Sequence, residues 1–484
     1  MPKISSSICN KIRGWISSAN QDTEVFTTDG KVVFCNPCGK SIVCERKSQV
    51  DQHIKTAAHV SALKNKLSKQ QLITTNSRSS SNIFFEDLCF AMVSSDIPLH
   101  KLKTEQFRNF LNKYIDHPIP DESTLRKTYV NICYQKTINE IKEKIGKNFI
   151  YIVVDETTDT RGLYIGNLLV GVMNKIFSGK PYLLASKQLE KTNNETITRF
   201  INDSLKLLWT DVGMEQRVLL LLTDAASYMV KAGKSLKIFY TNMIHLTCTA
   251  HACNRLAEKV RELFPKVNTL INNGKKIFLK APSRISIFKE EMNDIPLPPV
   301  PVLTRWGTWV NAALYYADYL TKYKKVIERL AMDDAQSIRK VLNIIEDGTV
   351  VNDLTFISTH LAFLVIVIKK LETQNMTLHE SFSIIDEIKE KNNSIPGPKG
   401  ATLTTKLNEL SNKHKGLEIL RKINAELSGE NVQLEDVYQD PKIISCFKYA
   451  PTTSVDVERS FSVFKNMLTD KRHSFTEEKN LKCI

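Results

Sequence analysis

Four potential metal ligands near the N-terminus constrain the local fold more tightly than any other feature of this 484-residue chain. Cys35 and Cys38 are separated by two residues, and His53 and His59 follow with five residues between them. Two thiolates on a tight turn and two imidazoles on a following helix can close a tetrahedron around zinc, and this spacing lies within the usual range. The sequence therefore predicts a structural zinc site rather than four unconnected residues.

The residues around these ligands predict a ββα finger. The stretch between Cys38 and His53 has room for a second short strand at Ser41–Val43 and a turn before a helix that begins near Ser48. Because five residues separate the two histidines, we expect the helix to loosen near Thr56–Ala58 so that both rings reach one metal ion.

An excess of positive charge accompanies the predicted finger. The chain carries 67 Lys and Arg against 52 Asp and Glu, a formal charge of +15, and residues 31–72 contribute +6 of it. A basic surface attracts phosphates and releases their counterions on binding. We therefore expect double-stranded DNA as the partner of the finger helix, in preference to a merely solvated helix face. The side chains placed to meet bases or phosphates are Arg46, Lys47, Ser48, Gln49 and Gln52.

The sequence shows no pattern typical of secretion or membrane insertion. The N-terminal stretch MPKISSSICNKIRGW has no continuous apolar core followed by small residues, and the longest apolar run, Leu361–Ile368, is too short to cross a bilayer. We expect an intracellular chain with no membrane partner. In a reducing compartment, its ten cysteines are expected to be buried thiols or metal ligands rather than disulfides.

Composition and periodicity divide the chain into six segments. Apolar residues at helical spacing alternate with polar or Pro- and Gly-rich stretches, and these stretches suggest the boundaries. In chain order the segments are a finger at 24–72, a Ser- and Asn-rich linker at 73–82, a helical segment at 83–147, a strand-rich core at 148–258, consecutive helices at 259–444 with a loop at 392–403, and a short C-terminal segment at 445–484.

Two apolar runs predict buried central strands that each end at an aspartate. Phe149–Val154 is apolar on both faces and stops at Asp155, and the run RVLLLLT stops at Asp224. Runs of this kind are typical of strands buried inside a sheet. Further strands are expected at Leu163–Met173 and in PYLLASKQL, and an amphipathic helix is expected to begin at Asn194.

Aspartates at two strand ends form a pattern that metal-dependent phosphoryl transfer requires. Asp155 and Asp224 could hold a divalent cation between them, and two cations about 3.5 to 4 Å apart stabilise both the attacking and the leaving oxygen. Glu458, in the predicted helix of TSVDVERSFS, offers a third acid. Each acid taken alone is more often a helix cap, a turn residue or a surface group than a catalytic residue, and it is the pair of aspartates at two strand ends that favours catalysis.

Sequence blocks along nearly the whole chain resemble those of one known family. The N-terminal finger is similar to the BED-type finger of hAT-superfamily transposases and, in detail, to that of CGG triplet-repeat-binding proteins. The blocks VDETTD, LLTDAAS, CTAHACN, RWGTW and TSVDVERSFS are similar, in this order, to blocks of hAT transposases. The resemblance implies a nuclear α/β multidomain protein. Its RNase H-like mixed sheet would be interrupted by a large all-α insertion and followed by a helical C-terminal dimerisation segment.

The resemblance also implies roles for particular residues. Asp155, Asp224 and Glu458 match the catalytic acids that would hold Mg²⁺ or Mn²⁺, and Asp159 is the fallback for the first position. Trp306 matches a tryptophan that stacks on a flipped base, an interaction worth about 1 to 3 kcal/mol.

Cys248 and His251 can be interpreted either as metal ligands or as residues that pack near the active site. Cys248 and His251 recur as a pair in the family, and their spacing would suit a metal. Because no second pair of ligands accompanies them, we favour packing near the active site over a metal site.

The sequence is compatible with three functions. The first is a zinc-dependent nuclear DNA-binding protein of transposase descent, a transcriptional or repeat-DNA regulator that forms homo-oligomers through its C-terminal segment. The second is an active cut-and-paste DNA transposase that cleaves and transfers strands by a two-metal mechanism. The third is a non-catalytic scaffold for protein interaction and dimerisation.

Overall fold

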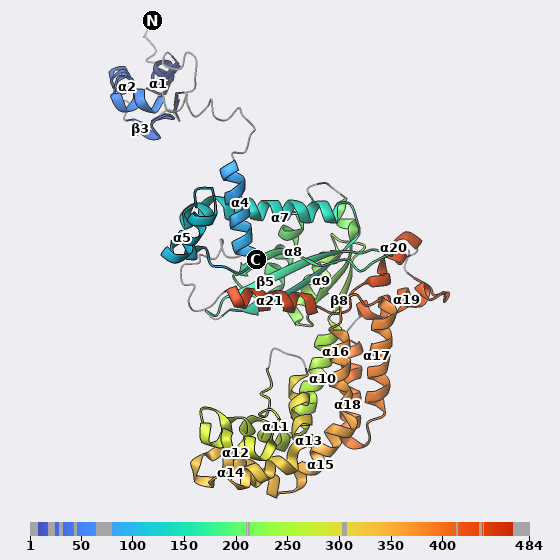
Figure 1. Ribbon diagram of the computed structural model, residues 1–484. Coiled ribbons are helices and arrows are strands. Elements are labelled where there is room, and N and C mark those ends of the chain that lie inside the picture. The colour runs from blue at the N-terminus through green and yellow to red at the C-terminus, as the bar shows by residue number, and fades with distance from the viewer. Residues whose placement is uncertain are drawn as a thin grey trace. The chain divides into compact units, whose positions relative to one another are not determined.

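The chain is divided into two units, Met1–Phe84 and Phe85–Ile484, in the computed structural model (Figure 1). The residues that the structure describes are 8–17, 25–28, 32–42, 46–63, 80–159, 161–209, 211, 213–302, 307–412, 415–434, 438 and 440–467.

The N-terminal unit combines a small sheet with helices. Its elements are α1 (Ile8–Ser17), β1 (Phe26–Thr28), β2 (Val33–Cys35), β3 (Lys40–Ile42) and α2 (Lys47–Ile54). Within the described residues, the strands pair antiparallel in the order β1-β2-β3. Ile12 and Ile16 of α1 are buried against Val33 and Val50, so that α1 contributes to the same core as the sheet and α2.

The predicted finger agrees with this unit in outline. The second strand lies at β3 and the helix begins at Lys47, one residue from each predicted position. The helix ends at Ile54 and the chain is helical again over 57–63, so the predicted loosening occurs, slightly earlier than expected. The sequence prediction included neither β1 nor α1.

A helical segment begins the second unit. Its elements are α4 (Ser80–Ser94), η1 (Leu99–Lys103), α5 (Glu105–Tyr114), α6 (Glu122–Thr124), η2 (Leu125–Tyr129) and α7 (Val130–Ile145). Helix α4 begins inside the predicted linker 73–82, and the rest of that linker lies outside the described residues.

The core of the second unit is a mixed sheet. Its strands are β4 (Ile150–Thr158), β5 (Tyr164–Val172), β6 (Tyr182–Leu189), β7 (Val218–Thr223) and β8 (Ile244–Thr247). Over the part of the chain that the structure describes, they lie in the order β6-β5-β4-β7-β8. The pairs β4–β5 and β5–β6 are antiparallel, whereas β4–β7 and β7–β8 are parallel. The mixed α/β class predicted from the sequence is therefore correct.

Strand β4 continues beyond Asp155, where the sequence predicted its end. Its parallel pairing with β7 stops at Val153, but its antiparallel pairing with β5 continues to Thr158. The backbone of residues 155–158 is thus held by β5 alone. Asp155 therefore lies just past the end of the parallel pairing, and the backbone beside it stays ordered.

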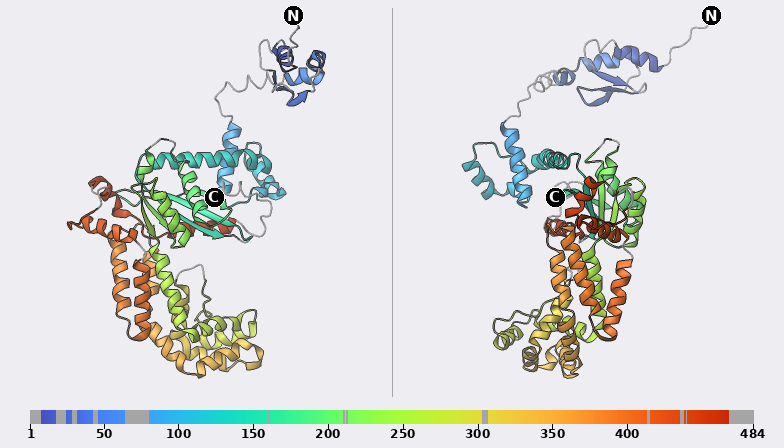
Figure 2. Two further views of the ribbon diagram at one scale, coloured as in Figure 1. Left: turned by 180° about the vertical axis from the view of Figure 1, so that it is seen from behind. Right: turned by 90° about the vertical axis from the view of Figure 1, so that its right-hand side faces the viewer.

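Alternation along β4 sends neighbouring side chains to opposite faces of the sheet. Ile152 and Val154 pack with α7, α8 (Asn194–Leu205) and α9 (Ser227–Lys237). Tyr151 and Val153 pack on the other face, with α17 (Leu378–Asn393), α19 (Lys415–Leu427), α20 (Pro441–Cys446) and α21 (Val455–Met467). Figure 2 shows helices on both faces of this sheet. The alternation places Asp155 on the face that α21 covers.

Helices between β8 and α19 form a separate apolar core. They are α10 (Thr249–Leu263), α11 (Pro265–Gly274), α12 (Pro282–Met292), α13 (Thr308–Glu328), α14 (Gln336–Glu346), α15 (Thr349–His360), α16 (Phe363–Leu371), α17 and α18 (Gly397–Asn412). In Figure 1, α10, α16, α17 and α18 extend from the sheet toward α11–α15. Helix α19 returns to β8, where Gly416 allows close approach, since an added Cβ would lie 2.1 Å from the carbonyl oxygen of His245.

The prediction of a loop at 392–403 is wrong for most of its length. Helix α17 ends at Asn393 and α18 already begins at Gly397. Gly397 has a φ of 74°, which suits a sharp turn, and Pro398 follows in the first turn of the helix, where proline is tolerated. The sequence Pro-Gly-Pro thus starts a helix here.

No single helix among the described residues is long and apolar enough to cross a membrane. Helices α15 and α16 meet the length and composition criteria only as a pair, with a 43° bend between them. Their apolar side chains belong to the helical core described above.

Candidate functional site

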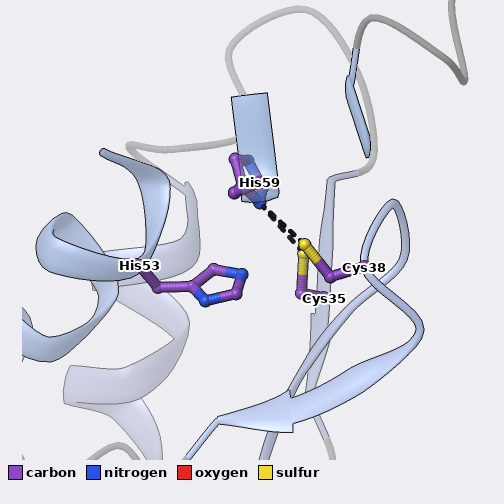
Figure 3. A group of neighbouring side chains, drawn as sticks. All are labelled: Cys35, Cys38, His53 and His59. Atoms are coloured by element: carbon purple, nitrogen blue, oxygen red, sulfur yellow. Dashed lines mark hydrogen bonds between the residues drawn. The ribbon is translucent and has the colours of Figure 1, made fainter. Parts of the chain in front are cut away.

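Cys35, Cys38, His53 and His59 converge in the N-terminal unit (Figure 3). One donor atom of each residue lies within 4.8 Å of the donor atoms of the other three. Nδ1 of His59 is 3.3 Å from Sγ of Cys35 and 3.4 Å from Sγ of Cys38. The spacing in the sequence therefore predicted this cluster correctly.

Local backbone structure presents these four donors to one point. Cys35 ends β2, and Cys38 lies in the turn that follows, which closes by a 2.9 Å hydrogen bond from the amide of Gly39 to the carbonyl of Cys35. His53 lies in the last turn of α2, and His59 lies in the helical stretch 57–63. The break between the two helical stretches lets both imidazoles face the thiols.

The donor set fits zinc. Nε2 of His53 is buried and has no hydrogen-bond partner among the described residues, as expected for a metal-binding nitrogen. Burial, assisted by the charge of His53, lowers the pKa of His59 and favours its neutral form. Neutral imidazoles and thiolates are the donors that tetrahedral zinc prefers.

The side chain of Phe26 packs against both histidines of the cluster. Its backbone pairs directly with Cys35 across β1 and β2, and its side chain is only 2% exposed. Its ring is stacked on His59 and meets the edge of His53 at a centroid distance of 6.2 Å. The sequence prediction did not include Phe26. An aromatic residue nine positions before a predicted zinc ligand, ahead of a short strand, could have indicated a residue that packs against the ligands.

The predicted DNA-contacting residues of α2 divide into two groups. Arg46, Lys47, Ser48 and Gln52 are exposed, as contact with DNA requires. Gln49 is half-buried, and its Oε1 accepts a 3.0 Å hydrogen bond from the amide of Arg46, so this side chain supports the start of the helix instead. Trp306, the predicted base-stacking residue, lies outside the described residues.

A second group of donors converges in the core of the second unit. Asp155 of β4, His251 of α10 and Glu458 of α21 present donor atoms within 4.8 Å of one another. Nε2 of His251 lies 3.6 Å from Oε1 of Glu458. Segments far apart in the sequence thus bring two of the three predicted catalytic acids together.

Electrostatic coupling in this group is strong. Burial, followed by the charge of Glu458, raises the pKa of Asp155 well above its usual value. Burial acts to lower the pKa of His251, but its hydrogen bond with Cys248 and the charges of Cys248, Asp155 and Glu458 raise it to about 9. Burial acts to raise the pKa of Cys248, but the contact with His251 lowers it overall. The arrangement can thus hold a positive charge between the two carboxylates.

Asp224, the remaining predicted acid, lies outside this donor group. It is half-buried, and its Oδ1 accepts a 3.0 Å hydrogen bond from the amide of Ala226 at the start of α9. Its charge contributes to the raised pKa of Asp155, so the two side chains are close enough to interact.

Asp159, the fallback acid, is occupied in the turn between β4 and β5. Its carboxylate accepts hydrogen bonds from the backbone amides of Arg161 and Leu163 and from Nε of Arg161, at 2.8 to 3.0 Å. Burial acts to raise its pKa, but these hydrogen bonds lower it overall. Asp159 thus has a structural role in this turn.

Two neighbours of the core group were missed from the sequence. Ser454, fully buried, donates its backbone amide to Sγ of Cys248 at 3.2 Å and places its Oγ 3.3 Å from Nδ1 of His251. Glu156 accepts a hydrogen bond from the hydroxyl of Tyr228, and its Oε2 is buried with no hydrogen-bond partner in the described part of the chain. Burial, together with the charge of Asp224, raises the pKa of Glu156.

Comparison with protein families gives two matches. Residues 120–277 match a domain of unknown function (DUF659), which spans β4–β8 and includes Asp155, Asp224 and His251. Residues 9–65 match the CGGBP1 N-terminal domain, which includes the Cys and His cluster and nearly all of α1. A search of curated proteins finds no match. The two family matches support the resemblance to hAT transposases and, over the N-terminal domain, to CGG triplet-repeat-binding proteins.

Proposed function

We propose that the chain is a zinc-dependent, nuclear, double-stranded DNA-binding protein that regulates transcription or repeat DNA. The observation that carries the proposal is the four-donor cluster directly beside a helix with exposed basic residues. The match to the CGGBP1 N-terminal domain over this same region fits DNA binding.

Zinc would act by holding α2 in place. The apolar core of the N-terminal unit is small, and small domains with limited cores often depend on a structural metal. With His53 and His59 tied to the cysteine turn, the exposed start of α2 can enter a major groove. Arg46 and Lys47 would then contact phosphates, and Ser48 and Gln52 would contact phosphates or base edges.

Fluorescence anisotropy with labelled duplexes tests this proposal. The probes are a CGG-repeat duplex and a shuffled duplex of the same composition, each measured with the zinc-loaded full chain. We expect Cys38→Ser to weaken binding of the preferred duplex at least about tenfold, because one ligand of a structural zinc is lost. Cys446→Ser, a change at a half-buried cysteine of α20 in the other unit, is the matched control. Equal binding by both variants would refute zinc-dependent recognition.

Strand cleavage is a second candidate, favoured by the convergence of Asp155 and Glu458. The antiparallel hairpins β4–β5–β6 followed by parallel β7 and β8 support an RNase H-like core. In this proposal Mg²⁺ or Mn²⁺ would be held by Asp155, Glu458 and the neighbouring Asp224, and would activate water and then a 3′-hydroxyl for attack on phosphate.

Incubation with Mg²⁺ or Mn²⁺ and duplexes that carry candidate terminal inverted repeats tests the cleavage candidate. Metal-dependent nicks that disappear in Asp224→Ala, and persist in a variant of the exposed Asp203 to Asn, would support it. Binding without nicks would favour the proposed DNA-binding regulator over a nuclease. If the zinc-loaded chain binds neither the CGG-repeat duplex nor the inverted-repeat duplex, a scaffold function is favoured instead.

We also propose that the C-terminal segment mediates homo-oligomerisation. Val463 on α21 is an exposed apolar residue, 49% accessible. Multi-angle light scattering of the full chain and of Val463→Asp would test this, with a lower mass expected for the variant.

A further inference from the structure

The core donor group draws its three side chains from three different elements. Asp155 comes from strand β4, His251 from the first turn of α10 and Glu458 from the first turn of α21. All three donor atoms lie within 4.8 Å of one another, a separation that one cation with ligand bonds of about 2.0 to 2.2 Å can span. Asp155 is only 6% exposed, so its carboxylate depends on these neighbours rather than on solvent.

The surroundings of His251 aim one of its nitrogens at the carboxylates. Nδ1 lies 3.3 Å from Oγ of Ser454, while Nε2 lies 3.6 Å from Oε1 of Glu458. Ser454 is itself fixed by the hydrogen bond from its amide to Sγ of Cys248. Metal-binding histidines are commonly oriented in this way, with the second nitrogen bonded to a neighbouring polar group.

We propose that His251 is a metal ligand, and that Asp155, His251 and Glu458 together form a mixed carboxylate and imidazole site for a divalent cation. The proposal goes beyond DNA binding by the N-terminal unit. It also changes the three-acid set that the family resemblance implies, because Asp224 lies outside the group and accepts a hydrogen bond from Ala226 instead.

The identity of the ligands predicts which cation binds best. Mg²⁺ favours oxygen ligands in octahedral geometry, whereas a site that includes nitrogen also binds first-row transition metals, of which Mn²⁺ is the weakest binder. Two carboxylates and one imidazole therefore predict tighter binding of Mn²⁺ than of Mg²⁺. Mn²⁺ is also a suitable probe because it is the weakest competitor for the cysteine-containing zinc cluster of the other unit.

The competing explanation is a plain ion pair. In that case His251 is a cation that neutralises the two carboxylates, and it would repel an incoming metal ion. The two explanations predict opposite results when His251 is replaced by Gln. Loss of a ligand weakens Mn²⁺ binding, whereas loss of a competing cation leaves it unchanged or strengthens it.

Electron paramagnetic resonance of the full, zinc-loaded chain distinguishes these explanations. Titration with Mn²⁺ measures affinity from the signal of the free ion, and pulsed measurements detect ¹⁴N coupling to a directly bound imidazole. We expect one site per chain with ¹⁴N coupling in the unmodified protein. We expect His251→Gln to lose the coupling and to weaken Mn²⁺ binding by at least about tenfold, because even loss of an outer-shell partner typically costs about 10- to 100-fold. His379→Gln, at an exposed histidine of α17, is the matched control and should change neither.

Three results would overturn the proposal. They are no Mn²⁺ bound at the core, a bound ion without ¹⁴N coupling in the unmodified protein, or unchanged or tighter binding by His251→Gln. The coupling in the unmodified protein is decisive even if the variant folds poorly, which thermal melting would reveal. No DNA is present in the experiment, so its outcome is independent of whether the chain binds or cleaves a duplex.

Discussion

The ring of Phe26 lies almost parallel to the imidazole of His59, with centroids 5.8 Å apart and planes inclined by 7°. The two residues come from opposite ends of the zinc finger sequence, one on β1 and the other in the last helical stretch. Because Phe26 also pairs with Cys35, one aromatic residue links the sheet, a thiol ligand and an imidazole ligand. This packing would hold the proposed ligands in place for a metal ion.

Replacement of Phe26 by Ala should therefore weaken zinc binding as well as folding of the N-terminal unit. Loss of a buried phenyl ring typically costs about 3 to 5 kcal/mol, and here the cavity would lie against His59. Competition with a chromogenic chelator measures the zinc affinity. Phe34→Ala is the control, because Phe34 lies on the neighbouring strand but is 42% exposed. Equal zinc affinities for the two variants would contradict a supporting role for Phe26.

Removal of zinc should unfold one unit and spare the other. The four donors lie within Met1–Phe84, whereas Phe85–Ile484 has its own extensive cores. Hydrogen exchange followed by mass spectrometry, with and without a strong chelator, measures this by segment. We expect rapid exchange at β2 and α2 after chelation and no change in β4 or β7. Matching loss of protection in both units would mean that their folding is coupled.

Helix α1 should contribute measurably to the stability of the finger. Ile12 is 1% exposed and packs in the core beside the zinc cluster. Ile12→Ala should lower the free energy of unfolding of the N-terminal unit by about 2 to 5 kcal/mol, the usual range for a buried isoleucine. Arg13→Ala, at the neighbouring exposed position, should have little effect. Denaturant titration of the zinc-loaded protein provides the comparison, and similar midpoints would show that α1 is dispensable.

Asp159 should stabilise the sheet in a pH-dependent way. Its folded pKa is lowered, so its contribution is fully present above the unfolded pKa of about 3.9 and is lost as the pH falls through the folded value. Asp159→Ala should cost about 1 to 3 kcal/mol at pH 7, because two backbone amides and Arg161 lose their acceptor. The difference in free energy of unfolding between the two proteins should be largest at pH 7 and should shrink as the pH falls below the unfolded pKa of about 3.9. A constant difference across this range would exclude the carboxylate as the cause.

The sequence predicted local features whose signal is itself local. Ligand spacing was enough for the zinc cluster, since Cys35 and Cys38 share one turn and His53 and His59 lie a few residues apart. Continuous apolar runs were enough for β4 and β7, because a strand buried on both faces excludes polar residues. The end of β4 was misplaced because its last four residues depend on pairing with β5, a tertiary contact that polar DETT does not reveal.

Features that depend on distant segments could not be read from pattern alone. Ser454 offers only a local signal, as a residue that can cap the helix of TSVDVERSFS, whereas its contacts with Cys248 and His251 lie some two hundred residues away. Glu156 directly follows Asp155 in the sequence, but alternation along β4 sends it to the opposite face, where the hydroxyl of Tyr228 donates a hydrogen bond to it. Helix α1 was missed because its apolar face is short and lies outside the ligand pattern.

Zinc titration of DNA binding tests the central claim most directly. The full chain is stripped of metal, mixed with a labelled CGG-repeat duplex at fixed ionic strength, and supplied with zinc in steps while anisotropy is recorded. The account predicts weak binding by the stripped protein and full recovery at one equivalent of zinc per chain, since a single cluster organises α2. Equally tight binding before and after zinc addition would contradict it.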